Sequence, residues 1–146
     1  TAVDTSTLNT FNLTKTSNET IGSLQYDRSY FVRQESVNGT LTITDNQTVT
    51  IMAVRFSGRA DTACRFLAAQ LARDEDYDII ADGERTNANG LEFYQVNLTR
   101  GSNLHQRYYC SKIKDNAGTV INAESTSAGT LDSLQVHYVL NSIKKK

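Results

Sequence analysis

The sequence has no proline, no long hydrophobic run and no excess of basic residues. Average usage would place about seven prolines in a chain of this length, but their absence predicts no particular function. No stretch approaches the roughly 20 apolar residues of a transmembrane helix, so the sequence predicts no membrane span. The 15 Lys and Arg residues are balanced by 16 Asp and Glu residues. Nucleic-acid-binding proteins normally carry a basic surplus, so we expect no nucleic-acid partner.

Motifs for catalysis, metal binding and phosphate binding are also missing. The only two cysteines, Cys64 and Cys110, form no C-x-x-C motif. The two histidines, His105 and His137, have no metal-ligand spacing with each other or with the cysteines. The eight glycines fall mainly in turns and form no phosphate-binding loop. We therefore predict no catalytic residue, no metal site and no cofactor.

The length of 146 residues suits one domain. Residues 1–20 are rich in Thr and Asn and poor in apolar residues, which is the composition of a flexible tether. We expect this tether at 1–20 and a single domain at 21–146. Because the chain begins at Thr1 rather than Met, we also expect that a signal peptide or lipid-anchor segment has been removed upstream. The alternative is a fragment of a longer protein.

Alternating apolar residues predict most of the secondary structure as strands. Residues 23–35 alternate in this way, although Arg28 interrupts the apolar positions. Residues 39–56 predict a hairpin with DNQ as its turn, and the second arm, Val49–Phe56, predicts a central strand covered on both faces. Further strands are predicted at 77–85, 91–99, 104–114 and 118–126. Turn-forming clusters separate these four strands and favour a sequential antiparallel meander.

Two segments predict helices. Ala60, Cys64 and Leu67 recur at spacings of four and three, the stripe of an amphipathic helix, for which Ser57 and Asp61 are candidate N-caps. The last segment, from residue 128, fits both a strand and a helix. We favour a helix capped by Thr130, because Asp132 lies in its first turn and lysines follow its end. The element order predicts an α+β fold, with an antiparallel sheet of about six to seven strands and two packed helices.

This layout resembles the sandwich fold shared by PsbP proteins, the Ran-binding Mog family and the DcrB lipoproteins. The resemblance runs from about residue 39 to the end. It rests on the strand TVTIMAV leading into a helix, the segment NGLEFYQVNL with Gly90, the paired tyrosines, and a closing helix that ends in VLNSI. It implies the fold, an exported or lipid-anchored setting, and a role in binding or assembly rather than catalysis.

The two cysteines leave three interpretations open. With Asp61 as N-cap, Cys64 would lie in the first turn of a helix, where a thiol pKa is lowered and a nucleophile is favoured. In an exported protein, a disulfide between Cys64 and Cys110 is favoured, because the count is even and the bond would join a helix to a neighbouring strand. The third interpretation is two buried thiols.

A cluster of acidic residues follows the first helix: Asp74, Glu75, Asp76, Asp78, and then Asp82 and Glu84. Calcium binding is one interpretation, but an EF-hand loop starting at Asp74 would need glycine at Ile79 and glutamate at Arg85. The others are a solvated loop and an acidic surface that recognises a basic partner.

The adjacent Tyr108 and Tyr109 must face opposite sides of their strand, so we expect one of them to be exposed. An exposed tyrosine beside Arg107 is a candidate anchor for a protein contact, and core packing is the alternative. We predict a contact surface that combines Asp74, Glu75, Asp76 and Asp78 with Arg107 and Tyr109.

The sequence therefore predicts a non-enzymatic, exported domain, periplasmic or secreted, that binds another protein or an envelope component. One alternative is a periplasmic immunity protein that blocks a toxin active site. Another is a cysteine- or metal-dependent enzyme.

Overall fold

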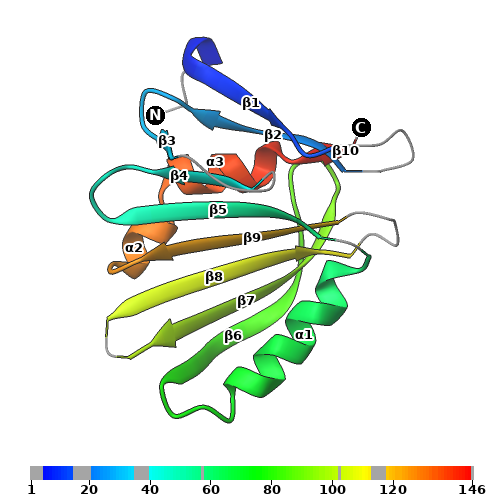
Figure 1. Ribbon diagram of the computed structural model, residues 1–146, viewed down its shortest axis with the longest axis vertical. Coiled ribbons are helices and arrows are strands. Elements are labelled where there is room, and N and C mark those ends of the chain that lie inside the picture. The colour runs from blue at the N-terminus through cyan, green and yellow to red at the C-terminus, as the bar shows by residue number, and fades with distance from the viewer. Residues whose placement is uncertain are drawn as a thin grey trace.

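The computed structural model describes residues 5–14, 21–34, 40–56, 58–101, 103–112 and 118–145. The helices are α1 (Ala60–Leu71), α2 (Ala128–Leu131) and α3 (Leu134–Ser142), and a 3₁₀ turn spans Thr5–Thr7. The strands are β1 (Leu8–Asn12), β2 (Ile21–Asp27), β3 (Val32–Gln34), β4 (Leu41–Thr44), β5 (Val49–Phe56), β6 (Tyr77–Thr86), β7 (Glu92–Arg100), β8 (Leu104–Ser111), β9 (Gly118–Ser125) and β10 (Lys144–Lys145). The predicted α+β fold is confirmed (Figure 1).

The larger sheet has seven described strands in the order β3-β4-β5-β9-β8-β7-β6, all antiparallel. The run β6-β7-β8-β9 is the predicted meander. Gly90 and Gly101 lie in its turns with φ of 80° and 64°, a left-handed conformation that glycine adopts without steric cost. The turn chemistry and the period-2 pattern therefore agree, which is why this part of the sheet was predictable.

The predicted hairpin at 39–56 is also confirmed, as β4 and β5. Asp45 fixes the turn, because its Oδ1 accepts backbone N–H bonds from Gln47, Thr48 and Val49 at 2.9–3.0 Å. Residue 39, at the start of the predicted segment, lies outside the described residues.

The single strand predicted at 23–35 is wrong, because the chain forms β2 and β3 in different sheets. Asp27 accepts bonds from the backbone N–H and the hydroxyl of Ser29 at 2.9 and 2.6 Å. Its carbonyl also accepts the N–H of Phe31 at 2.9 Å. This turn ends β2 at Asp27, directly before Arg28, the residue that interrupts the alternation of apolar residues in the sequence. Residue 35 is not among the described residues.

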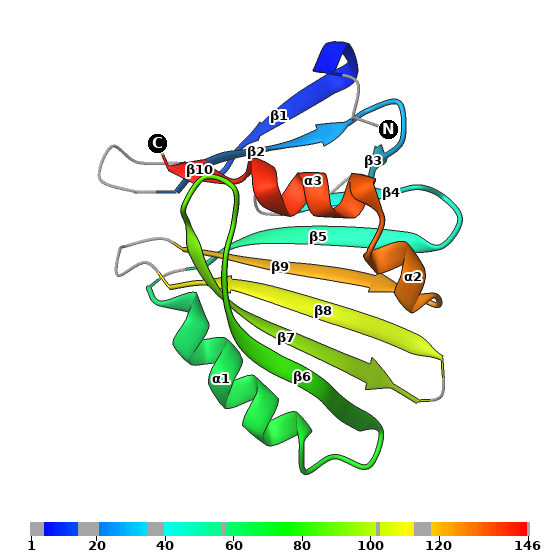
Figure 2. The same cartoon turned by 180° about the vertical axis from the view of Figure 1, so that it is seen from behind.

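The N-terminal segment differs from the predicted tether. Leu8–Asn12 forms β1, which pairs antiparallel with β2, and β10 pairs with the other edge of β2 to complete a smaller three-stranded sheet (Figures 1 and 2). Phe11 packs against the main core. Composition alone missed this strand, because its ladder partners lie 11 to 19 residues away in the chain. Residues 1–4 and 15–20 of the predicted tether lie outside the described part.

The C-terminal segment is helical, as favoured, but it forms two helices rather than one. The short α2 ends at Leu131, with Asp132 as its C-cap, and α3 begins after Ser133, whose hydroxyl accepts the N–H of Val136 at 3.4 Å. Ser133 and not Thr130 is therefore the N-cap of the longer helix. Val136, Val139 and Leu140 are buried on α3.

The larger sheet is covered on both faces, each by a different helix. Tyr109 and Cys110 are neighbours on β8 and therefore point to opposite faces. Tyr109 belongs to the main core, with residues of β2, α2 and α3, whereas Cys110 belongs to a second core under α1. In both views α1 lies beside β6 to β8 and α3 lies near β2 and β4 (Figures 1 and 2).

Cover on the larger sheet is incomplete at two places. β5 was predicted to be buried on both faces, but Met52 is 40% exposed while Val49, Ile51 and Ala53 are buried. The reason is that α1 packs over β6 to β9 and not along the length of β5. The second uncovered area, on the α3 side of β6 and β7, is described below.

Candidate functional site

The acidic loop, defined as Asp74, Glu75 and Asp76 with Asp78 on β6, connects α1 to the sheet. Asp74 shapes it, because its carboxylate accepts the N–H of Asp76 at 3.0 Å and its carbonyl accepts the N–H of Tyr77 at 3.1 Å. Gly101 donates to the carbonyl of Asp76 at 2.8 Å, so the loop lies beside the β7–β8 turn. All four acidic residues are exposed. Within the described residues, the carboxylates of Glu75, Asp76 and Asp78 contact no cation.

β6 is the terminal strand of the larger sheet as described, so its outer edge carries backbone N–H and C=O groups with no partner strand among the described residues. The strand is ten residues long and contains an irregularity between Ile79 and Ala81, where Ile80 is 65% exposed. Asp82 and Glu84 add two more carboxylates. The hydroxyl of Tyr94 donates to Asp82, and Glu84 is bound by Lys112 and Arg65 at 2.6 and 3.4 Å.

The structure does not join Tyr109 to the predicted contact surface. Tyr109 is 2% exposed and belongs to the main core, while Tyr108 is half-buried on the α1 side, so neither is an exposed anchor. The prediction that the two face opposite sides is right. Burial raises the pKa of Tyr109 in spite of the neighbouring Arg107 and Arg85 guanidiniums.

Arg107 is also less accessible than predicted. Its side chain is 14% exposed and forms an ion pair with Asp132, in the turn between α2 and α3. The hydrogen bond from Arg107, together with its charge, lowers the pKa of Asp132 below its usual value. Arg107 and Asp78 lie on the same face of the sheet, on β8 and β6, with β7 between them. The loop residues Asp74–Asp76 lie at one end of that face.

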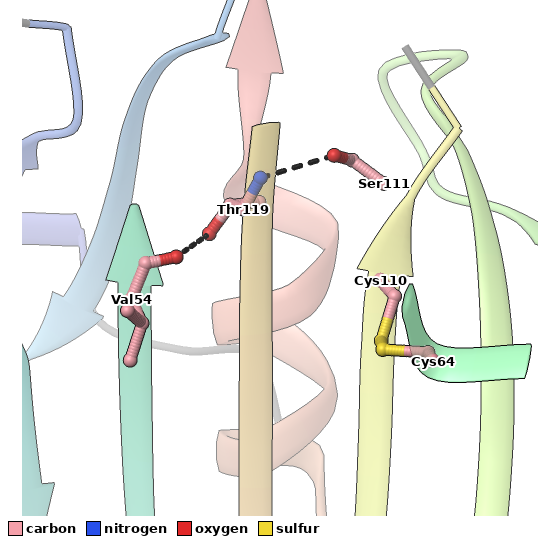
Figure 3. Close-up of a disulfide and its surroundings, with 5 residues drawn as sticks. All are labelled: Val54, Cys64, Cys110, Ser111 and Thr119. Atoms are coloured by element: carbon pink, nitrogen blue, oxygen red, sulfur yellow. Dashed lines mark hydrogen bonds between the residues drawn. A yellow bond between two sulfur atoms is a disulfide. The ribbon is translucent and has the colours of Figure 1, made fainter. Parts of the chain in front are cut away.

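Cys64 and Cys110 form a disulfide that joins α1 to β8, with their Cα atoms 6.4 Å apart (Figure 3). Both residues are buried. Of the three interpretations of the cysteines, the disulfide is the one found in the structure. In this oxidised state Cys64 has no free thiol that could act as a nucleophile.

The start of α1 explains why sequence reasoning misplaced its N-cap. The cap residue is Arg59, which makes no side-chain capping bond, and Ser57 lies outside the described residues. Asp61 is buried inside the first turn instead, and Arg59 donates to both of its carboxylate oxygens at 3.0 and 2.7 Å. Burial opposes ionisation of Asp61, but the hydrogen bonds and charge of Arg59 outweigh it and lower its pKa.

Next to the disulfide, side-chain hydrogen bonds join β9 to β8 and to β5 (Figure 3). The backbone N–H of Thr119 donates to the hydroxyl of Ser111 at 3.0 Å, and the hydroxyl of Thr119 donates to the carbonyl of Val54 at 3.1 Å. A Cβ on Gly118 would lie 2.5 Å from the Ser111 oxygen and 3.1 Å from the carbonyl of Gly58. Gly118 is therefore required for this close approach.

The uncovered face of β6 and β7 holds an open hollow of about 220 Å³, lined by Ala81, Asp82, Gly83, Glu84, Gln95 and Asn97. Gln95 pairs with Tyr109 in register and so lies on the side of the sheet that α3 covers elsewhere. Sequence reasoning missed this site. The sequence did contain an indication of it. Polar Gln95 and Asn97 alternate with apolar residues along β7, and the apolar residues are the buried ones: Tyr94, Val96 and Leu98.

The histidines contribute no assembled site. His137 lies 3.8 Å from Asp132, and His105 is half-buried on β8. Among the residues that the structure describes, no three His, Cys, Asp or Glu side chains are grouped so that they could hold a metal ion. Within the same part of the chain, no helix is long and apolar enough to cross a membrane.

Comparison with solved structures identifies the fold. Cyanobacterial PsbP (CyanoP) from Synechocystis superposes with a TM-score of 0.60 and 14% identity, over 99% of this chain and 95% of that one. This chain has the PsbP fold. A protein from Bacteroides thetaiotaomicron matches with a TM-score of 0.52 and 10% identity, over 85% of this chain. The aligned part is only 44% of the Bacteroides protein, so the chain spans less than half the length of that relative.

The PsbP likeness is structural. No family model and no curated protein sequence matches this chain. The resemblance predicted from element order is confirmed at the level of the PsbP fold. At 14% sequence identity, the shared fold does not assign a ligand, a partner or an activity to this chain.

Proposed function

We propose that this chain is an exported, non-enzymatic binding domain, and that its contact surface is the acidic loop together with the outer edge of β6. The observation that carries the proposal is the position of the acidic cluster. Six carboxylates between residues 74 and 84 line one loop and the terminal strand of the larger sheet. They therefore lie where a partner strand could add to the sheet.

The chemistry of this surface favours a basic, extended partner segment. An uncovered strand edge offers main-chain hydrogen bonds to any added strand, and side-chain charges then decide which strand is accepted. Glu75, Asp76 and Asp78 form no ion pair with another described residue, so lysines or arginines of a partner would gain charge pairs without displacing existing ones. Arg107 lies away from this edge and Tyr109 is buried, so neither is part of the proposed surface.

Export is supported by the disulfide, since such bonds persist in oxidising compartments and are rare in the cytosol of most organisms. Intact mass after denaturing alkylation, on protein taken from its native cells, tests this part. We expect no alkyl group to add before reduction and two after it. Addition of two groups without reduction would contradict export.

The contact surface is tested by zero-length carbodiimide cross-linking in extract from the native cells, which joins carboxylates to lysine amines in ion-pair contact. We expect cross-links to one partner at Glu75, Asp76 or Asp78, and loss of that partner in the variant Asp78→Lys. The matched control is Glu92→Lys, which makes the same charge change at the start of β7. Equal capture by wild type and both variants, or cross-links confined to other carboxylates, would refute the proposed surface.

A further inference from the structure

Along β6, residues whose backbone groups face β7 alternate with residues whose backbone groups face away from the sheet. In an antiparallel ladder, directly opposite residues alternate between pairs that exchange hydrogen bonds and pairs that do not. The N–H of Asn87 donates to the carbonyl of Leu91 at 2.9 Å, so these two form a bonded pair. In the register that continues from this pair, Thr86, Glu84 and Asp82 form the unbonded pairs with β7. Their backbone N–H and C=O groups therefore point outward from the edge.

This run is the longest uninterrupted part of the β6 edge, and it is accessible. The other part is shorter, because the N–H of Tyr77 already donates within the acidic loop and the irregularity after Ile79 breaks the register. Every residue from Asp82 to Thr86 is exposed except Arg85, which is half-buried. Within the described residues no strand lies beyond β6 (Figure 1). The outward groups of this run are therefore open to an added strand.

The sheet face under α1 offers a negative charge to the side chains of an added strand. Asp82 pairs with Val96 in register, and Val96 belongs to the core under α1, so the carboxylate lies on that face. Glu84 lies on the same face and is neutralised by Lys112 at 2.6 Å. Asp82 accepts the uncharged hydroxyl of Tyr94 and forms no ion pair with a described residue. A basic side chain opposite Asp82 would therefore gain a charge pair.

The other face offers space, because it holds the hollow of about 220 Å³. A Cβ added to Gly83 would have no atom within 4 Å, and Ala81 adds only a methyl group. Gln95 and Asn97 supply amide groups, and no basic residue lines the hollow. It is smaller than the roughly 300–1,000 Å³ of sites that enclose drug-sized ligands, so it fits one large side chain. An aromatic residue placed opposite an edge glycine covers the glycine backbone in this way.

Charge excludes a second copy of this chain as the occupant. If two β6 edges paired antiparallel through their outward residues, Glu84 would face Glu84 of the other copy, or Asp82 would face Glu84 in the neighbouring register. Like charges directly opposite each other destabilise a strand pair. The carboxylates and the irregularity also disfavour uncharged strands. The edge is therefore selective for a basic segment of a different protein.

We propose that residues 82–86 form a strand-addition site for a basic, extended segment of another protein. The segment adds antiparallel to β6, with a lysine or arginine opposite Asp82 and an aromatic side chain opposite Gly83, in the hollow. The antiparallel direction matches every strand pair of the larger sheet and is the more stable one. This inference rests on the proposed function and narrows the contact to one stretch of the edge and one register.

The test uses the whole chain, ¹⁵N-labelled, and the blocked peptide Val-Thr-Lys-Tyr-Lys-Thr-Val as the probe. In the free protein, we expect fast hydrogen exchange at the amides of Asp82, Glu84 and Thr86, and protection at Gly83 and Arg85, which bond to β7. The peptide should bind saturably and protect the three outward amides. Its two lysines then face the carboxylates, and its tyrosine lies over Gly83.

Three altered peptides separate the contributions of backbone, charge and ring. Methylation of the backbone nitrogens of both lysines keeps the charges but removes the donors that face the edge, so affinity should fall about tenfold or more. Glutamate in place of both lysines should abolish binding. Alanine in place of tyrosine should weaken binding, because the hollow is left unfilled.

Two variants locate the peptide on the protein. Gly83→Val should weaken binding of the tyrosine peptide by filling the hollow, at a position where the added side chain meets open space. Asp82→Asn keeps an acceptor for the Tyr94 hydroxyl and should weaken binding about threefold. Asp76→Asn is the matched control, since it makes the same charge change in the loop beyond the reach of the peptide, and it should bind as wild type does.

The proposal is overturned if the lysine peptide does not bind, or if its backbone-methylated form binds equally well. It is also overturned if Gly83→Val keeps the wild-type unfolding midpoint and the wild-type affinity for the tyrosine peptide. Either failure is distinct from failure of the proposed function, which is decided by the cross-links at Glu75, Asp76 or Asp78 in native extract. Those cross-links together with equal binding of the methylated peptide would mean that the partner is held by charge and not by strand addition.

Discussion

Reducing the Cys64–Cys110 disulfide should lower the stability of this domain by an amount that the chain length between the cysteines predicts. The residues are 46 positions apart, and the loop between them contains most of α1, all of β6 and β7, and most of β8. On the chain-entropy model, releasing a loop of this length costs about 4 kcal/mol at 25 °C. For a domain of this size, that loss lowers the unfolding midpoint by roughly 8–16 °C.

The assay is urea unfolding of the wild-type protein with and without a phosphine reductant. Reduction leaves both sulfur atoms in place, so no cavity is created and the comparison isolates the covalent link. The double variant Cys64→Ala/Cys110→Ala is the control, and its free energy of unfolding should not respond to reductant.

Hydrogen exchange of the α1 amides separates the two possible origins of the effect. If the bond acts through the unfolded chain, α1 in the reduced protein should lose protection only as much as the whole domain does. A loss below about 1 kcal/mol would refute the entropic reasoning. Selective loss of protection in α1 would also refute it, since the bond would then act by holding the helix on the folded sheet.

Three further changes test the packing around the site. Gly118→Ala should lower the free energy of unfolding in urea by about 1–3 kcal/mol, because the added Cβ would overlap the Ser111 hydroxyl. Gly83→Ala should be nearly neutral, because its Cβ would meet open space. Equal effects of the two variants would contradict the close approach at Gly118. Because the pKa of Asp61 is lower in the folded protein than in the unfolded chain, its carboxylate stabilises the fold. This contribution to the free energy of unfolding is complete above the unfolded-chain pKa of about 4 and is lost as the pH falls below it. The variant Asp61→Asn should therefore lose less free energy of unfolding than the wild type when the pH is lowered below about 4. An equal loss in the two proteins would show that Asp61 makes no such contribution. Ser133→Ala should lower the free energy of unfolding by about 1 kcal/mol, because it removes the side-chain cap of α3. Ser127→Ala, at the start of α2 where no side-chain cap bond is made, should cost less. A larger loss for Ser127→Ala would exclude Ser133 as the stabilising cap.

The features predicted correctly from sequence were those encoded by neighbouring residues. The meander follows from period-2 alternation and from turn residues such as Gly90 and Gly101, and the hairpin follows from the Asp45 turn. Helical spacing likewise located α1 and the C-terminal helices, although their caps were misplaced. The disulfide was anticipated from an even cysteine count, but as one of three interpretations.

Only the tertiary structure decided which faces are covered, and therefore where the candidate site lies. A strand such as β1 depends on ladder partners in β2, and the burial of Tyr109 depends on α3 packing across the sheet, so neither is written in local periodicity. The hollow at Gly83 exists because the main core covers β4, β5, β9 and the start of β7 at Phe93 but does not reach Gln95, Asn97 and the facing residues of β6. The sequence by itself determined the strands of the β4–β5 hairpin and of the β6–β9 meander, and the alternation of polar Gln95 and Asn97 with apolar residues on β7. Which of those polar residues face a cavity was settled by long-range packing, because burial depends on elements that are distant in the chain.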